Sequence, residues 1–309
     1  MGKTAFLFAG QGAQTPGMGE DFFNEIATAR KIYEMGERLC AGITDMCFHG
    51  DGAELNRTEN AQPCLFLTDL AIAESLKEKG IVPDAVAGFS LGEIPAIAFS
   101  GIMPYEEAFR FVMQRGRDMA EQSAKHPGGM AAALKLDRDT VDTICSEFKE
   151  IWAVNYNCPG QIACSGSNDE LDAFIEKIKS AGGRAVKLAV SGAFHTPYMN
   201  EVCVSLKKFL NESDDLKGAD TVLYSNYTGE KYPSDRETII RNLSLQVCSP
   251  VQWETILRNM WADGIDTFIE VGAGATLTGF VKRTLPEAKY YTVNNIDALR
   301  ALEKETVGI

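Results

Sequence analysis

The sequence predicts an α/β fold in which a large, mostly parallel sheet is covered by helices and carries a small inserted ferredoxin-like unit. Short apolar segments alternate with amphipathic helical segments in the two outer parts of the chain, as in parallel sheets that are covered on both faces. In the middle part, the predicted order of elements is βαββαβ, the order of a ferredoxin-like unit. We therefore expect a discontinuous large domain over 1–128 and 191–309, interrupted by a small domain over 129–190.

The first part of the large domain begins with a buried strand over 5–9, which stops at Gly10-Gln11-Gly12. A second, small strand over 84–88 ends just before Ser90. Apolar residues at helical spacing, with a stop signal at Gly80, predict helices between and after these strands. These helices cover 18–40, 61–79, 91–99 and 105–123.

The pattern of the chain changes after Gly128-Gly129, where the small domain begins. The turn signal Asn157-Cys158-Pro159-Gly160 separates its two middle strands. Its strands are expected over 130–136, 151–155, 161–164 and 185–190, and its helices over 138–150 and 168–180. Beyond it, helices are expected over 199–211, 237–245, 252–263 and 275–284, and strands over 221–224, 267–271 and 290–293.

Charge and composition narrow the classes of partner. The net charge of −13 argues against nucleic acid, because phosphate binding needs a cationic surface. There is no apolar run of the ~20 residues that a membrane span needs, no signal-peptide core and no polybasic anchor, so we expect a cytoplasmic protein without membrane contact. The eight cysteines include no C-x-x-C pair, and no His/Cys/carboxylate cluster has zinc-like spacing, so we expect neither a disulfide framework nor a metal.

The segment Gly88-Phe89-Ser90-Leu91-Gly92 matches G-x-S-x-G between a predicted strand and a predicted helix. A nucleophilic serine must sit on a sharp turn with its hydroxyl exposed, and flanking glycines permit that backbone. The following helix points its N–H groups toward an oxyanion that forms there. A glycine-flanked turn with an N-cap serine is the alternative, but the strand–helix context favours Ser90 as a nucleophile.

A general base for this serine must come from three histidines. His49 lies in a polar loop and His126 in a linker, so both are expected to be solvated. His195 follows a predicted strand, where the loops of α/β sheets build sites. Elimination therefore favours His195, and the group that orients its ring is left open.

Two further features are compatible with a site. Arg115 is four residues from both Phe111 and Met119, on or beside the apolar stripe of its helix. Such an arginine either extends its charge to solvent or binds an anion, for which its guanidinium fork suits a carboxylate. The loop Gly10-Gln11-Gly12 is expected at the same sheet edge as Ser90, where a plain turn and an oxyanion role are about equally favoured.

Six segments stand in one order along the chain and carry a family resemblance. They are Gly10-Gln11-Gly12-Ala13-Gln14, Gly88-Phe89-Ser90-Leu91-Gly92-Glu93, Gln114-Arg115-Gly116, Asn155-Tyr156-Asn157-Cys158-Pro159-Gly160-Gln161, Ala193-Phe194-His195 and Gln246-Val247-Cys248-Ser249-Pro250-Val251-Gln252-Trp253. Together they resemble the malonyl-CoA:acyl carrier protein transacylases and, more broadly, the acyltransferase domains of fatty-acid and polyketide synthases. The resemblance covers nearly the whole chain and implies a hydrolase-like large domain with the inserted ferredoxin-like unit.

The resemblance implies an activity: a malonyl group moves from coenzyme A to the phosphopantetheine thiol of acyl carrier protein in fatty-acid or polyketide synthesis. The reaction is then ping-pong through an acyl-serine, with malonyl-CoA and acyl carrier protein as partners and no cofactor.

The resemblance also implies residue roles. Ser90 is acylated and His195 is the base, oriented by the main-chain carbonyl of Gln246. The amides of Gln11 and Leu91 form the oxyanion hole, and Arg115 pairs with the malonyl carboxylate. Two phenylalanines complete the implied site. Phe194 favours malonyl over methylmalonyl, and Phe89 replaces the histidine that usually precedes the serine, removing polar contacts near the acyl group.

Two other functions remain as alternatives. An α/β-hydrolase, an esterase or thioesterase, shares G-x-S-x-G but would place an acid between serine and histidine in the chain. It would need neither Arg115 nor the inserted unit. A non-catalytic module that docks carrier protein is disfavoured by the presence of Ser90, His195 and Arg115 together.

Overall fold

The computed structural model describes residues 2–190 and 192–306. Its helices are α1 Glu20–Glu25, α2 Ala27–Leu39, α3 Ile43–His49, α4 Gly52–Leu55, α5 Thr58–Glu78, α6 Glu93–Phe99, α7 Tyr105–Lys125, α8 Arg138–Ser146, α9 Asn168–Ser180, α10 Asn200–Glu212, α11 Arg236–Leu245, α12 Trp253–Ala262, α13 Thr276–Thr284 and α14 Ile296–Thr306. Its strands are β1 Lys3–Phe8, β2 Ala85–Gly88, β3 Gly128–Leu134, β4 Ile151–Cys158, β5 Gln161–Ser167, β6 Arg184–Lys187, β7 Val222–Leu223, β8 Ile265–Val271 and β9 Lys289–Val293. Three 3₁₀ turns matter below: η1 Ser90–Gly92, η2 Pro197–Met199 and η3 Gln246–Cys248.

The larger sheet is parallel and has the order β7-β2-β1-β8-β9. Alternate residues of β1 enter two different apolar clusters: Phe6 and Phe8 join one, and Ala5 and Leu7 join the other. Both faces of the strand are therefore buried, which explains its continuous apolar sequence. The α/β prediction for this part of the chain is confirmed.

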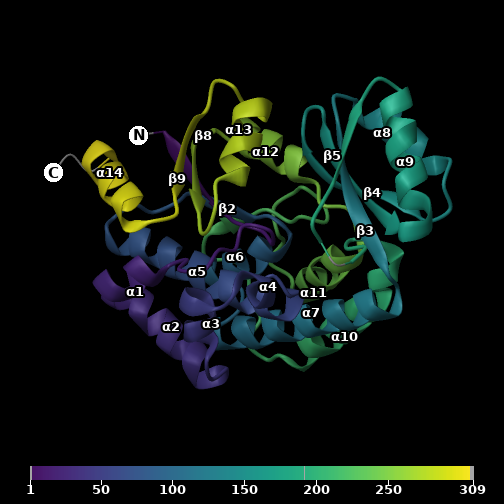
Figure 1. Cartoon of the computed structure of the whole chain (residues 1–309). Helices are drawn as coiled ribbons and strands as arrows, with labels where there is room; N and C mark the ends of the chain where they lie inside the picture. Colours follow the sequence, from purple (N-terminus) through teal and green to yellow (C-terminus); the bar gives the residue numbers. More distant parts are fainter. Residues whose placement is uncertain (1, 191, 307–309) are drawn as a thin grey trace.

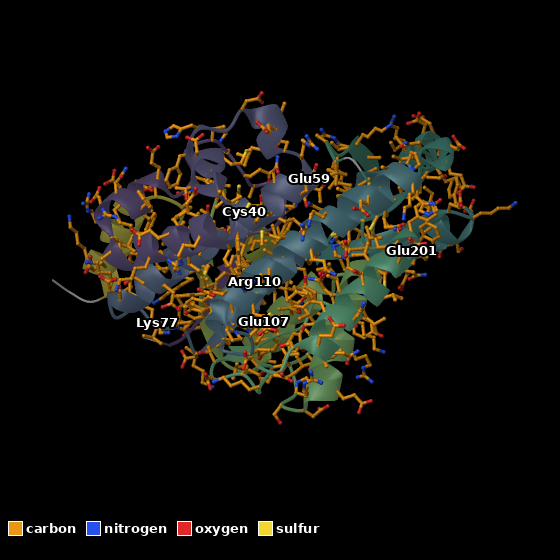
Figure 2. The ribbon with its side chains drawn as sticks, turned by 90° about the horizontal axis from the view of Figure 1, so that it is seen from below. Cys40, Glu59, Lys77, Glu107, Arg110 and Glu201 are labelled. Atoms are coloured by element: carbon orange, nitrogen blue, oxygen red, sulfur yellow. The ribbon has the colours of Figure 1, made fainter. Side chains whose placement is uncertain are left out.

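Helices cover the two faces of this sheet unequally. Figure 1 shows α12 and α13 beside β8, with α1, α2, α5, α6 and α7 forming a thick layer on the other side. The first cluster, with Phe6 and Phe8, includes apolar residues of α5, α6 and α7, and the second includes apolar residues of α12 and α13. The helical underside carries charges of both signs, among them Lys77, Arg110 and Glu201 (Figure 2).

The smaller sheet is antiparallel and has the order β4-β5-β3-β6, with α8 and α9 packed against it. The chain order β3-α8-β4-β5-α9-β6 confirms the predicted βαββαβ unit. Met130, Val154 and Ala163 on its other face join the apolar cluster of the larger part. The domain boundaries at 128 and 190 stay predictions, and Ser191, where the second large segment was expected to begin, lies outside the described residues.

A short segment just after η3 pairs with the smaller sheet. The N–H of Val251 donates to the carbonyl of Val154 at 2.8 Å, and the N–H of Tyr156 donates to the carbonyl of Val251 at 3.0 Å. Val251 thus pairs with β4 of the smaller sheet, only five residues after Gln246. This pairing fixes η3 relative to the smaller sheet.

Several helices differ from the prediction. The helix expected over 18–40 is two helices, because Ile26 is extended (φ −118°, ψ 122°). Arg30 explains the break in part, since its guanidinium donates to the carbonyls of Phe23 and Asn24, which end α1. Helices α3, α4 and α14 were not predicted, and His49 ends α3 instead of lying in a loop.

Among the described residues, no helix combines the length and apolar character needed to cross a bilayer.

Candidate active site

The predicted nucleophile lies on a tight turn at the carboxyl end of β2. Ser90 has φ 53°, in the left-handed region, and begins η1. A Cβ on Gly88 would lie 1.9 Å from the carbonyl oxygen of Gly92, and a Cβ on Gly92 would lie 2.3 Å from that of Phe8. Both glycines are therefore required by close backbone contacts, and the turn packs directly on the end of β1.

Ser90 and His195 lie in direct contact although 105 residues separate them. The Ser90 Oγ is 2.7 Å from His195 Nε2, and His195 Nδ1 is 2.9 Å from the carbonyl oxygen of Gln246. Because a carbonyl can only accept, Nδ1 carries the proton and Nε2 presents its lone pair to the serine hydroxyl. The pair is arranged for proton transfer from Ser90 to His195.

His195 is held neutral by its surroundings. It is 4% exposed and has φ 61°, so it too is in the left-handed region. Burial, and then the positive charge of Arg115, lower the pKa of His195 to about 4. A neutral imidazole at physiological pH can act as a base.

Arg115 completes the group beside Ser90. Its side chain is 1% exposed. Nη1 donates to Gln62 Oε1 at 2.9 Å, and Nη2 donates to Gln246 Oε1 at 3.0 Å and to Ser90 Oγ at 3.4 Å. All these acceptors are neutral, and Nε has no partner among the described residues. Burial lowers the pKa of Arg115 to about 10, so the guanidinium is charged at neutral pH. No carboxylate of the described residues forms a hydrogen bond or ion pair with it.

Gln246 does more than its predicted main-chain role. Its side-chain Nε2 donates to the carbonyl of Ser90 at 2.6 Å, while its Oε1 accepts from Arg115. One residue therefore contacts the predicted nucleophile, base and anion-binding cation. The sequence showed only the segment, because side-chain contacts over such separations leave no local pattern.

The two predicted oxyanion donors follow the carboxyl ends of two neighbouring parallel strands, Gln11 after β1 and Leu91 after β2. Leu91 directly follows Ser90 in η1. Gln11 follows Gly10, where an added Cβ would lie 2.7 Å from the carbonyl oxygen of Phe89, so this loop lies against the nucleophile turn. The Gln11 side chain is held by Thr58 Oγ1 at 3.2 Å.

The two predicted phenylalanines point into different surroundings. Phe89 packs against Trp253 and Phe280, with ring centroids 5.3 and 5.9 Å away. Phe194 is buried in the larger apolar cluster, next in sequence to His195.

A hollow of about 430 Å³ opens beside His195, between α8 and β4 on one side and η2 and η3 on the other. A second hollow, of about 490 Å³, lies near Gly274 and Asn294, and none of the predicted site residues lines it.

Three polar residues of the site escaped the sequence interpretation. Gln62 links Arg115 to the Gln11 side chain, Glu93 is fully buried after the nucleophile turn, and Asn226 accepts from the N–H of Ser90. His49 and His126 lie exposed elsewhere, as expected. Within the described ranges, no three His, Cys, Asp or Glu side chains gather to hold a metal ion.

Known proteins resemble this chain over nearly its whole length. The family model for the acyl transferase domain matches residues 5–304. The chain is 36% identical to a malonyl CoA-acyl carrier protein transacylase of Bacillus subtilis (strain 168), over 99% of each chain. Its structure is similar to that of the malonyl CoA-acyl carrier protein transacylase from Clostridium perfringens, with a TM-score of 0.94, 34% identity and coverage of 99% of this chain and 98% of that one.

A second solved structure is informative because it includes a partner. It is a malonyl-transacylase in complex with its type II PKS acyl-carrier protein, with a TM-score of 0.94, 27% identity and coverage of 98% of this chain and 100% of that one. The family match spans nearly the whole chain, the fold is the one expected from the resemblance, and the structure places Ser90 and His195 in contact. The chain belongs to the acyl transferase family.

Proposed function

We propose that Ser90 carries the malonyl group that this enzyme moves from coenzyme A to the phosphopantetheine thiol of an acyl carrier protein. The enzyme is an acyl-carrier-protein S-malonyltransferase of fatty-acid or polyketide synthesis, with malonyl-CoA and acyl carrier protein as partners. The observation that supports the residue roles best is the 2.7 Å contact between Ser90 and His195, beside a buried arginine that bonds only to neutral oxygens among the described residues.

The first half-reaction follows from this geometry. His195 Nε2 takes the proton of the Ser90 hydroxyl as its oxygen attacks the thioester carbonyl. The amides of Gln11 and Leu91 are proposed to stabilise the oxyanion, a contribution worth ~10²–10³ in rate per donor. When the tetrahedral intermediate collapses, the C–S bond breaks and the coenzyme A sulfur leaves with the proton from His195.

The second half-reaction runs the same steps with the carrier thiol. His195 takes the thiol proton, the sulfur attacks the acyl-serine, and Ser90 regains its proton as the C–O bond breaks. The carbonyl of Gln246 keeps His195 in the required tautomer. This partner is not a carboxylate, so the site departs from the Ser-His-acid triad that the hydrolase alternative requires.

Selectivity is assigned to Arg115, Phe194 and Phe89. A buried arginine whose contacts among the described residues are all neutral oxygens favours an acyl group that brings its own carboxylate, and malonyl does. Phe194, beside His195, is proposed to crowd a branching methyl, a preference worth ~1–3 kcal/mol. Phe89 is proposed to limit polar contacts near the acyl group. We further propose the cytoplasm as the place of reaction, since all eight cysteines are free thiols.

Intact-mass measurement tests the proposal. After brief incubation with malonyl-CoA, the wild-type chain should gain one malonyl group, and the Ser90→Ala variant should gain none. Adding carrier protein should discharge the acyl group onto the carrier. Rapid release of free malonate without carrier protein would instead support hydrolysis, and a malonyl group retained by Ser90→Ala would refute the assigned nucleophile.

A further inference from the structure

The backbone around Ser90 is held from outside its own turn. Asn226 follows β7, the edge strand that pairs with β2, and is fully buried. Its Oδ1 accepts from the N–H of Ser90 at 2.7 Å, and its Nδ2 donates to the carbonyl of Gly88 at 2.6 Å. One side-chain amide therefore bonds to the main chain at the nucleophile and two residues before it.

The partners determine the amide's orientation and the residue type. An N–H can only donate and a carbonyl can only accept, so Oδ1 must face Ser90 and Nδ2 must face Gly88. An aspartate would place a second oxygen against the Gly88 carbonyl, and an alanine would leave both main-chain groups without these partners. Asparagine satisfies both groups with one planar side chain.

Asn226 is itself fixed by buried contacts. Its own N–H donates to Glu93 Oε1 at 3.0 Å, and its carbonyl accepts from the N–H of Gln252 at 2.9 Å. The hydroxyl of Tyr232 donates to the same Glu93 oxygen at 2.9 Å. Glu93 immediately follows η1, so this contact ties Asn226 to the start of α6 as well as to the turn.

The hydrogen bonds from Asn226 are needed because the backbone conformation of Ser90 is unfavourable in free energy. A non-glycine residue in the left-handed region costs of order 1–3 kcal/mol and persists only where its surroundings hold it. The bond to Asn226 also occupies the N–H of Ser90, which leaves the Leu91 amide, and not that of Ser90, for the oxyanion.

We propose that Asn226 is a positioning residue for acyl transfer, whose side-chain amide holds the turn so that Ser90 Oγ faces His195. The proposal rests on the proposed role of Ser90. It predicts a selective loss in the acylation step, because the side-chain hydrogen bonds of Asn226 go to the main chain of Ser90 and Gly88 and not to Arg115. A misplacement of the nucleophile by about 1 Å is enough to cost ~10² in rate.

The test measures steady-state malonyl transfer from malonyl-CoA to carrier protein, giving kcat and KM for Asn226→Ala, and follows acylation of Ser90 by malonyl-CoA in rapid-quench experiments. We expect kcat to fall about 10²-fold, with KM within about threefold of wild type. The matched control is Asn259→Ala. The Asn259 side chain donates to the carbonyl of Gly229 and to Glu230. It therefore anchors the loop between β7 and α11 that contains Asn226, but neither of its acceptors belongs to the site. This variant should keep kcat within about threefold.

A second variant keeps the test decisive if Asn226→Ala does not fold. Asn226→Asp is isosteric and keeps the acceptor for Ser90 but loses the donor to Gly88, so its kcat should also fall at unchanged KM. A wild-type kcat in either folded variant, or an equal loss in Asn259→Ala, would overturn the proposal. Failure of the proposed function looks different: Ser90→Ala would then still become acylated.

Discussion

Arg115 is the residue that we propose separates malonyl transfer from other acyl transfer. In the part of the chain that the structure describes, no carboxylate contacts its guanidinium, and its two terminal nitrogens bond to neutral oxygens. A carboxylate brought by the substrate would supply the missing charge, whereas an acetyl group could not. The arginine should therefore affect one substrate and spare the other.

We expect Arg115→Ala to lower kcat/KM for malonyl-CoA about 10²-fold or more, because losing one partner of a buried charge pair costs roughly 2–5 kcal/mol. Acetyl-CoA loading should be spared or improved. Initial rates of acyl-enzyme formation by intact mass measure both. Arg110→Ala is the control, since Arg110 lies exposed on the same helix (Figure 2). Equal losses with the two thioesters would show that Arg115 acts on the fold and not on the substrate.

At the scale of elements, the position of the turn that carries Ser90, residues 88–92, is set by its close contact with the end of β1. A Cβ on Gly92 would lie 2.3 Å from the carbonyl oxygen of Phe8 and 2.5 Å from that of Ala9, and neither backbone atom can move without shifting the strand. The Gly10–Gln11 loop follows that same strand end. Any displacement of this strand end would move the Gly10–Gln11 loop and Ser90 together.

We expect Gly92→Ala to lower the free energy of unfolding by about 1–3 kcal/mol and to slow Ser90 acylation at least tenfold. Urea unfolding and rapid-quench acylation measure these effects. Gly279→Ala is a matched control, since Gly279 lies inside α13 and a Cβ there meets no atom within 4 Å. That change should stabilise the chain by about 0.5–1 kcal/mol through helix propensity. If the two variants behaved alike, the close contact would not matter.

The sequence predicted most elements because their signals are local. Helix α9 was expected over 168–180, where it is found, and the strand–turn–helix around Ser90 follows from glycines on both sides. Helix α5 shows what local signals miss. It begins at Thr58, three residues before the expected start, and so moves Pro63 from the first turn of the predicted helix to a position beyond the first turn. Tertiary burial of nearly the whole helix outweighs the hydrogen bond that a proline removes.

At the scale of the whole molecule, the site is an assembly of distant segments. Ser90 and His195 were predicted because motif and elimination each point to one residue. Asn226 lies 136 residues from Ser90, and the Gln246 side chain reaches across 156 residues to its carbonyl. Neither contact belongs to a local pattern, so only the folded chain shows that these amides bond to the main chain around Ser90.

The same assembly places a carboxyl group where charge is disfavoured. Glu93 is fully buried, and burial raises its pKa to about 7, although hydrogen bonds from Asn226 and Tyr232 and the charge of Arg115 act in the opposite direction. An acid whose pKa is higher in the folded than in the unfolded chain binds an extra proton when folded. The free energy of unfolding therefore falls as pH rises from about 4.5 to about 7, and it does not recover above that range.

Glu93→Gln removes this titration while keeping an oxygen acceptor for Asn226 and Tyr232. We expect the difference in free energy of unfolding, variant minus wild type, to increase with pH through that window by an amount on the order of 3 kcal/mol, and to stay constant above it. Urea unfolding of both proteins between pH 5 and 8 measures it. Buried Asp69, whose pKa is also raised, and His195, whose pKa is lowered, titrate in both proteins and so cancel in the difference. A difference that instead decreased with pH would mean that Glu93 is ionised in the fold and stabilised by Arg115, which would leave the arginine less available for a substrate carboxylate.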